Sequence, residues 1–172
     1  MNSTQLLKNL FDHMFWADAE VWNIIFDNNH KVEKDEKIKE LIYHIHLVQF
    51  AFLGIWKNVK VEYPKIDEFE SFKSISDWKR NNYKNIMNYI SNIDENNISN
   101  TADIPWSKYV EKQISQKPEN ISTFNTMLQV CLHSTYHRWQ LNIRLREFDC
   151  APPKVDYIIW LWSGKPESKW PE

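Results

Sequence analysis

Apolar residues recur at three- and four-residue steps in four long segments of the chain, which is the pattern of amphipathic helices. We predict these helices at about residues 3–28, 34–57, 77–93 and 122–148. The residues able to cap them are Ser3 or Thr4, Asp35, Ser76 or Asp77, and Ser122 or Thr123. The second segment is apolar on more than one face, which is typical of the central helix of a bundle. The pattern therefore predicts an all-α fold, a four-helix bundle.

The segments between and after these helices lack the same periodicity. Residues 59–74 contain Pro64 and many charges, so we expect a linker there. Residues 99–119, which include Pro105 and Pro118, are expected to form a short ribbon or an irregular insert before the fourth helix. Residues 155–162 follow two prolines and are expected to form a short C-terminal helix, although their composition also allows a strand. We expect residues 1–172 to form a single domain.

The apolar stripe of the fourth segment predicts which of its residues face the core. These are Phe124, Met127, Leu128, Cys131, Leu132, Leu141, Ile143 and Leu145. Cys131 is therefore expected to be a small buried hydrophobe rather than a nucleophile. Cys150 lies beyond the helix, where it could be exposed.

Composition excludes several classes of protein. Two glycines leave little material for tight hairpin turns, which argues against an all-β fold, and the basic residues are spread along a chain of net charge -2, so we expect no nucleic-acid partner. The chain has only two cysteines and opens without a secretory pattern, so we expect a cytoplasmic protein. No uninterrupted apolar run approaches the roughly 20 residues that span a bilayer, so we expect no membrane segment.

Two histidines one helical turn apart carry the main chemical signal. His133 and His137 lie about 40° apart around a helix axis, so both imidazoles can reach one metal ion. The second helix offers a third imidazole from His44 or His46, which are about 200° apart and cannot both face the same interior point. Three protein nitrogens with an open position suit a reactive metal. The alternative is that these are ordinary helix histidines held by hydrogen bonds.

Four motifs in order resemble the DinB/YfiT-like family of four-helix-bundle metalloproteins. HMFWAD at residues 13–18 is similar to the family's Tyr-Asn-x-Trp-Ala-Asn, and HIHLVQFAF at residues 44–52 to its His-Ile-x-x-x-Gln/Glu-x-x-Trp. HSTYHRWQ at residues 133–140 is similar to His-x-x-x-His-Arg-Gly-Gln, and CAPPKVDYIIW at residues 150–160 to the family's Pro-Pro-x-x-Asp-hydrophobic ending. The resemblance covers nearly the whole chain.

The resemblance implies a divalent transition metal, such as Zn, Ni or Fe, held by His44, His133 and His137. The positions of Gln49 and Phe52 in the motif favour His44 over His46. It also implies a small-molecule substrate, with either hydrolysis or transfer of a low-molecular-weight thiol as the reaction. The alternative function is a non-catalytic metal-binding or stress-associated bundle. The family and the aromatic content together suggest a homodimer.

Neighbouring residues carry further expectations. Trp139 replaces the small residue of the family pattern and is expected to narrow or reshape access to the metal. His13 is expected to pack within the first helix with a satisfied ring nitrogen, rather than to act near the metal. Arg138 is expected to pair with a carboxylate such as Asp18 and to fix the packing of the helices.

Overall fold

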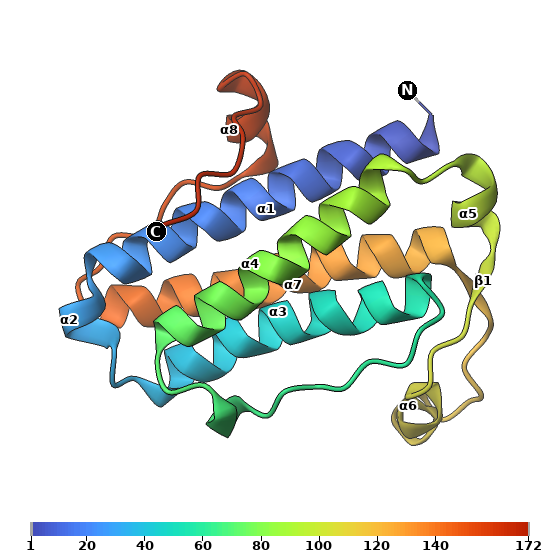
Figure 1. Cartoon of the computed structure of the whole chain (residues 1–172), viewed down its shortest axis with the longest axis horizontal. Coiled ribbons are helices and arrows are strands. Elements are labelled where there is room, and N and C mark those ends of the chain that lie inside the picture. Colours follow the sequence, from blue (N-terminus) through green and yellow to red (C-terminus); the bar gives the residue numbers. More distant parts are fainter. Residues whose placement is uncertain (1, 172) are drawn as a thin grey trace.

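Four long helices form the bundle in the computed structural model, which describes residues 2–171 (Figure 1). They are α1 (Ser3–Asp27), α3 (Glu36–Trp56), α4 (Phe72–Ser91) and α7 (Thr123–Glu147). The helices α1 and α7 run in one direction and α3 and α4 in the other (Figure 1). Each of α1 and α3 packs against both α4 and α7, so α1 and α3 are diagonal to each other. The all-α bundle predicted from the hydrophobic pattern is confirmed.

Short elements connect and extend the four helices. A long crossover from the end of α3 to the start of α4 contains the 3-10 turn η1 (Ile66–Glu68) and returns along the length of the bundle (Figure 1). The other short helices are α2 (Asn29–Val32), α5 (Glu95–Ser99), α6 (Ser107–Ile114) and α8 (Tyr157–Trp162). The C-terminal helix predicted after the two prolines is therefore confirmed as α8.

Polar side chains set where the long helices begin. Asp35 accepts a hydrogen bond from the backbone of Ile38 at 2.8 Å and Ser122 caps α7, as predicted. The cap of α1 is Asn2 rather than Ser3 or Thr4. The start of α4 was also predicted wrongly, since Ser71 caps the helix and exchanges hydrogen bonds with Ser74. The helix consequently begins at Phe72, inside the segment expected to be a linker, because Phe72 and Ile75 bury their side chains in the core.

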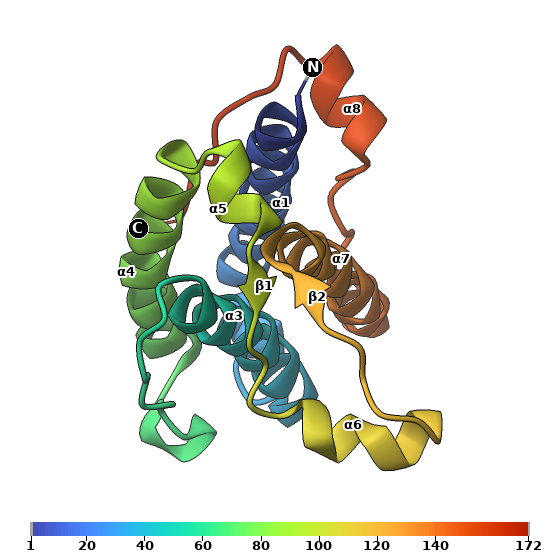
Figure 2. The same cartoon turned by 90° about the vertical axis from the view of Figure 1, so that its right-hand side faces the viewer.

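The insert before α7 is only partly as predicted. A ribbon of two short strands, β1 (Thr101–Ala102) and β2 (Ile121–Ser122), forms with Thr101 opposite Ser122. Between these strands lies α6, where a ribbon or an irregular loop was expected. Trp106, directly before α6, packs edge-on against Phe52 of α3 with ring centroids 5.3 Å apart. This contact attaches the insert to the side of the bundle (Figure 2).

Two predictions of burial were wrong. Leu132 and Ile143 of α7 were assigned to the core, but they are 67% and 36% exposed. Cys150 was placed where it could be exposed, but it is buried against the core cluster that includes Leu141 and Leu145. Its burial follows from the turn after α7, in which the Cys150 backbone donates a hydrogen bond to Leu145 at 3.0 Å.

Helix α3 is the most apolar of the long helices. Within residues 2–171 it is the one helix that is long and apolar enough, by length and composition, to cross a membrane. It packs against α4 and α7, and 56% of its most apolar window is buried inside the protein. This composition matches its place in the core of the bundle.

Candidate metal centre

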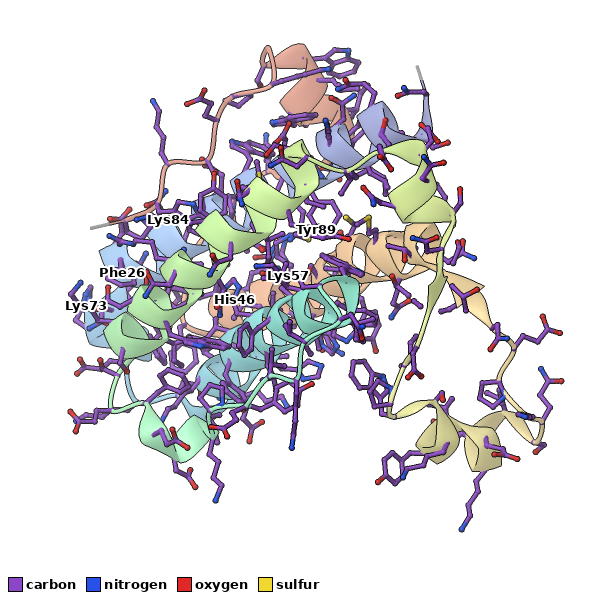
Figure 3. The ribbon with its side chains drawn as sticks, turned by 45° about the vertical axis from the view of Figure 1, so that its right-hand side comes forward. Phe26, His46, Lys57, Lys73, Lys84 and Tyr89 are labelled. Carbon is purple, nitrogen blue, oxygen red and sulfur yellow. The ribbon has the colours of Figure 1, made fainter. Side chains whose placement is uncertain are left out.

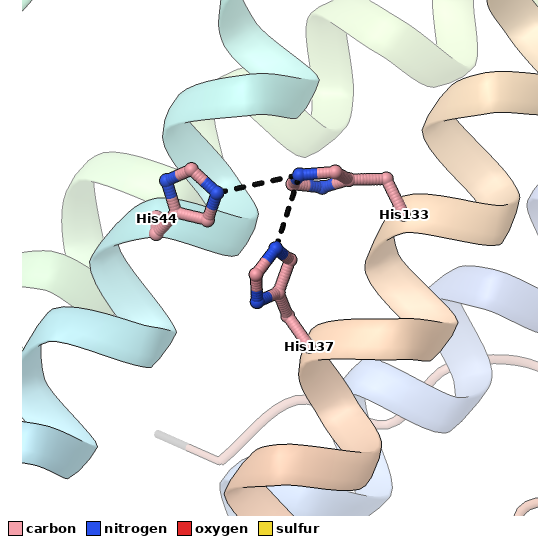
Figure 4. Close-up of side chains that lie close together, drawn as sticks. All are labelled: His44, His133 and His137. Atoms are coloured by element: carbon pink, nitrogen blue, oxygen red, sulfur yellow. Dashed lines mark hydrogen bonds between the residues drawn. The ribbon is translucent and has the colours of Figure 1, made fainter. Parts of the chain in front are cut away.

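Three imidazoles from α3 and α7 converge at the surface between these helices (Figure 4). The two helices are antiparallel and pack along their length, which brings His44 opposite the turn of α7 that carries His133 and His137. The Nε2 atom of His133 lies 3.3 Å from Nε2 of His44 and 3.1 Å from Nε2 of His137. The structure thus brings together the three residues predicted as metal ligands.

The N–H groups of the three neutral rings cannot make both short N···N contacts hydrogen bonds. Nδ1 of His137 lies 2.8 Å from Oε1 of Gln140, so His137 donates there and its Nε2 carries a lone pair when the ring is neutral. His133 then either donates to His137 or accepts from His44, and it cannot do both through one nitrogen. At most one of the two short N···N contacts is a hydrogen bond. A cation that accepts the three Nε2 lone pairs would give each of these atoms a partner, and this donor set therefore fits a divalent metal.

Burial and mutual repulsion favour the neutral rings that metal binding requires. All three side chains are half-buried. Burial, followed by the charge that His137 would carry, lowers the pKa of His44. The same two causes, with His44 added, lower the pKa of His133 to about 4. At neutral pH both rings are therefore uncharged and present lone pairs.

A hydrogen bond from the protein orients one of the three ligands. Gln140, three residues after His137 on α7, holds that ring through Nδ1 and directs Nε2 into the cluster. Nδ1 of His133 is buried and has no hydrogen-bond partner within residues 2–171. Gln140 orients one of the candidate ligands. The sequence analysis quoted it only as part of the motif at residues 133–140, although its spacing from His137 was a usable signal.

His46 takes no part in the cluster. Its Nε2 accepts a hydrogen bond from the indole of Trp22 at 2.8 Å, and its Nδ1 lies 3.0 Å from Oε1 of Gln49. The side chain is only 3% exposed and lies inside the bundle (Figure 3). Both ring nitrogens are thus occupied on the opposite side of α3 from His44, which supports the choice of His44.

A buried polar network lies behind the histidines. Gln49 donates to Asp18 at 2.9 Å and to Ser134 at 3.1 Å, so it links α3 to both α1 and α7. Asp18 also pairs with Arg138, as predicted, and each of these two side chains is 3% exposed. Ser134 and Arg138 directly follow His133 and His137 in the chain. The network therefore fixes the rotation of α7 that presents both ligands to α3.

The remaining sequence candidates lie away from the cluster. His13 is buried, and its Nε2 lies 2.8 Å from the carbonyl oxygen of Val155, as the packing interpretation predicted. Cys131 is buried, and burial raises its pKa to about 12, so it is no nucleophile. Trp139 is 61% exposed and lines a cavity of about 620 Å³ on another side of α7. Access to the histidines does not pass over that ring.

The cluster has room for further ligands. Among the described residues, no cysteine or carboxylate joins the three histidines as a fourth protein donor. His44 and His133 both line a cavity of about 1000 Å³ between α3, α7 and the insert. A metal held by three histidines would therefore have an open coordination position and an adjacent space for a small molecule.

Comparison of the chain with models of known protein families gives no match, and comparison with curated proteins gives no match either.

Proposed function

We propose that this chain is a metal-dependent enzyme of the DinB/YfiT-like type, in which His44, His133 and His137 hold a divalent transition metal such as Zn, Ni or Fe. The observation that carries the proposal is the convergence of three Nε2 atoms, with Nε2 of His133 3.3 Å from that of His44 and 3.1 Å from that of His137. Three histidine ligands from two helices, with no cysteine, carboxylate or further histidine beside them in residues 2–171, are typical of a catalytic site rather than a closed structural one. The order of the four sequence motifs supports the family.

The proposed reaction class is the one that the family resemblance implies, and the ligand set is compatible with it. A divalent metal supplies Lewis acidity that lowers the pKa of a coordinated water or thiol, which suits hydrolysis or transfer of a low-molecular-weight thiol. The chain itself contributes neutral imidazoles, a ring oriented by Gln140, and a cavity that begins at His44 and His133. Phe52 and Trp106 line that cavity and pack against each other.

A non-catalytic metal-binding bundle is the second candidate. The positions of the ligands favour it, because a metal bound by His44 of α3 and by two residues of α7 would link two core helices. The two candidates differ in whether the metal has an exchangeable coordination position. A cobalt-loaded protein whose visible spectrum changes when azide or a small thiol is added has an exchangeable position, and a spectrum that stays unchanged supports the structural role.

The first experiment measures metal content in full-length protein without a histidine tag. After dialysis against buffered Zn²⁺, we expect about one metal per chain by mass spectrometry, and we expect its loss in the His133→Ala, His137→Ala double variant. His30→Ala is the matched control, because His30 is exposed on α2, remote in sequence from the cluster. Equal metal content in all three proteins would overturn the proposal.

A further inference from the structure

The cavity beside the histidines has a composition that restricts what it can bind. It lies between α3, α7 and the insert formed by β1, α6 and β2, and it has a volume of about 1000 Å³. His44 and His133 line it, whereas His137 does not. The insert extends away from the bundle (Figure 3), and its residues line this space on the side opposite α3 and α7. A small molecule in the cavity would therefore contact the cluster at His44 and His133.

The walls of the cavity differ in polarity. On α7, Asn125 and Gln129 precede His133 at four-residue steps, so one wall presents neutral hydrogen-bonding groups along a single helix face. The opposite wall, on α3, is apolar beyond His44 and consists of Val48, Ala51 and Phe52. The insert is mixed: it contributes apolar side chains, among them Ile104, Trp106 and Val110, together with the neutral polar side chains of Thr101, Ser107, Gln116 and Asn120. This arrangement suits an elongated molecule with an apolar face and a few neutral polar groups along one edge.

The charged residues of the lining are both acidic. Asp103 and Glu119, both exposed residues of the insert, line the cavity, and no lysine or arginine does. Lys108 and Lys112 belong to α6 but are exposed and outside the lining. Away from the proposed metal, an anionic group on a ligand would therefore find no cationic side chain in the lining, and the two exposed carboxylates would disfavour it.

We propose that this cavity selects an elongated small molecule whose tail is apolar and ends in a neutral or positively charged group, and that it discriminates against anionic tails. The head of such a molecule would reach the proposed metal, and to that extent the inference rests on the proposed function. Within the thiol-transfer alternative, the same lining favours a non-acidic thiol over one that carries carboxylates.

Three matched hydroxamates test the selectivity on zinc-loaded, full-length protein by calorimetry. Octanohydroxamic acid has a neutral tail, its ω-amino analogue a cationic tail, and suberic acid monohydroxamate an anionic tail, with the same metal-binding head. We expect the anionic compound to bind at least tenfold more weakly than the neutral one, and the cationic compound to bind at least as tightly as the neutral one. Equal or tighter binding of the anionic compound would overturn the inference.

A variant that adds a positive charge gives an independent readout. Gln129→Lys places an ammonium group in the polar wall, one helical turn before His133. We expect it to raise the affinity for suberic acid monohydroxamate about tenfold relative to octanohydroxamic acid, with unchanged metal content. Gln5→Lys makes the same substitution at an exposed position of α1 and should leave the ratio unchanged. A ratio that does not move in Gln129→Lys contradicts the inference.

Metal-free protein separates this inference from the proposed function. Octylamine and octanoate probe the tail-binding space alone, with the fluorescence of Trp106 as the signal and Trp106→Phe to identify it. If no metal binds but octylamine still binds more tightly than octanoate, the proposed function fails and the selectivity stands. If metal binds, but the hydroxamates bind equally well and octylamine and octanoate also bind equally well, the selectivity fails and the metal site stands. Failure of every hydroxamate and of octylamine to bind also overturns the inference.

Discussion

Asp18 of α1 and Arg138 of α7 form an ion pair inside the bundle, with each side chain 3% exposed. Arg138 follows His137 directly, and Asp18 also accepts a hydrogen bond from Gln49 of α3. The pair therefore lies at the junction of the three helices that position the histidines. Its partners stabilise each other in a region where an unpaired charge would be poorly solvated.

We expect Asp18→Asn to lower the free energy of unfolding by about 3–5 kcal/mol, because it leaves the Arg138 guanidinium buried without a counter-charge. Urea denaturation followed by circular dichroism measures the change. The matched control is Glu40→Gln, which breaks the exposed pair between Lys37 and Glu40. That change should lower stability by less than about 1 kcal/mol. Equal effects of the two variants would contradict a structural role for the buried pair.

Lys79 of α4 predicts a pH dependence of stability. Its side chain is buried and its Nζ has no hydrogen-bond partner within residues 2–171. Burial lowers its pKa to about 6, far below the value of about 10.4 in an unfolded chain. Between these two values the unfolded state binds more protons, so the contribution of Lys79 to stability rises as the pH rises.

Lys79→Met should therefore stabilise the protein at pH 7, and its advantage over the parent chain should shrink as the pH approaches 10. Urea midpoints measured at pH 7 and pH 10 check this expectation. Lys84→Met on the same helix is the control, because Lys84 is exposed, and its effect should be independent of pH in this range. A stabilisation by Lys79→Met that stays constant from pH 7 to pH 10 would contradict the burial of a neutral amine.

Gln140 predicts a graded effect on metal affinity. Gln140→Leu removes the acceptor that holds Nδ1 of His137, and we expect the affinity for Zn²⁺ to fall about 10- to 100-fold. Gln140→Glu keeps an oxygen acceptor at the same reach and should restore most of that affinity. Competition with a chromophoric chelator measures both values. Identical affinities of the Leu and Glu variants would show that the contact does not orient the ring.

The predicted homodimer has a specific candidate surface on α7. Leu132, Tyr136, Trp139 and Ile143 are exposed and follow one another at steps of four, three and four residues, which is the spacing of a helix-pairing seam. We expect Trp139→Glu to convert the protein to a monomer in sedimentation equilibrium at micromolar concentration. Trp162→Glu, at a similarly exposed position of α8, should leave the dimer intact. A parent chain that sediments only as a monomer would reject the prediction.

Most of the helices were predictable because their apolar residues follow the helical period over many turns. The start of α4 was missed because Ser71 and Phe72 follow a charged, proline-containing stretch, and their helical role depends on contacts with the distant core. Helix α6 was missed because it is short and has no fully buried residue. Its apolar side chains line a cavity, so the usual signal of a core-facing stripe is weak.

The candidate site was predictable to different degrees in its parts. Spacing alone placed His133 and His137 on one face of α7. The choice between His44 and His46 depended on the rotation of α3, which hydrogen bonds to Trp22 and Gln49 determine in three dimensions. A single sequence does not contain that rotation. The exposure of Leu132 and Ile143 was missed for the same reason, because one helix can carry a core stripe and a second apolar stripe side by side.

The paired strands β1 and β2 give the insert a defined pair of stems. Thr101 faces Ser122 in this ribbon, and the backbone of Thr123 donates to Asn100 at 2.8 Å directly beside it. The residues from 103 to 120 thus leave and re-enter the bundle at one closed junction. The protein is therefore suited to loop grafting, in which residues 103 to 120 are replaced to change the lining of the cavity while the helices keep their arrangement.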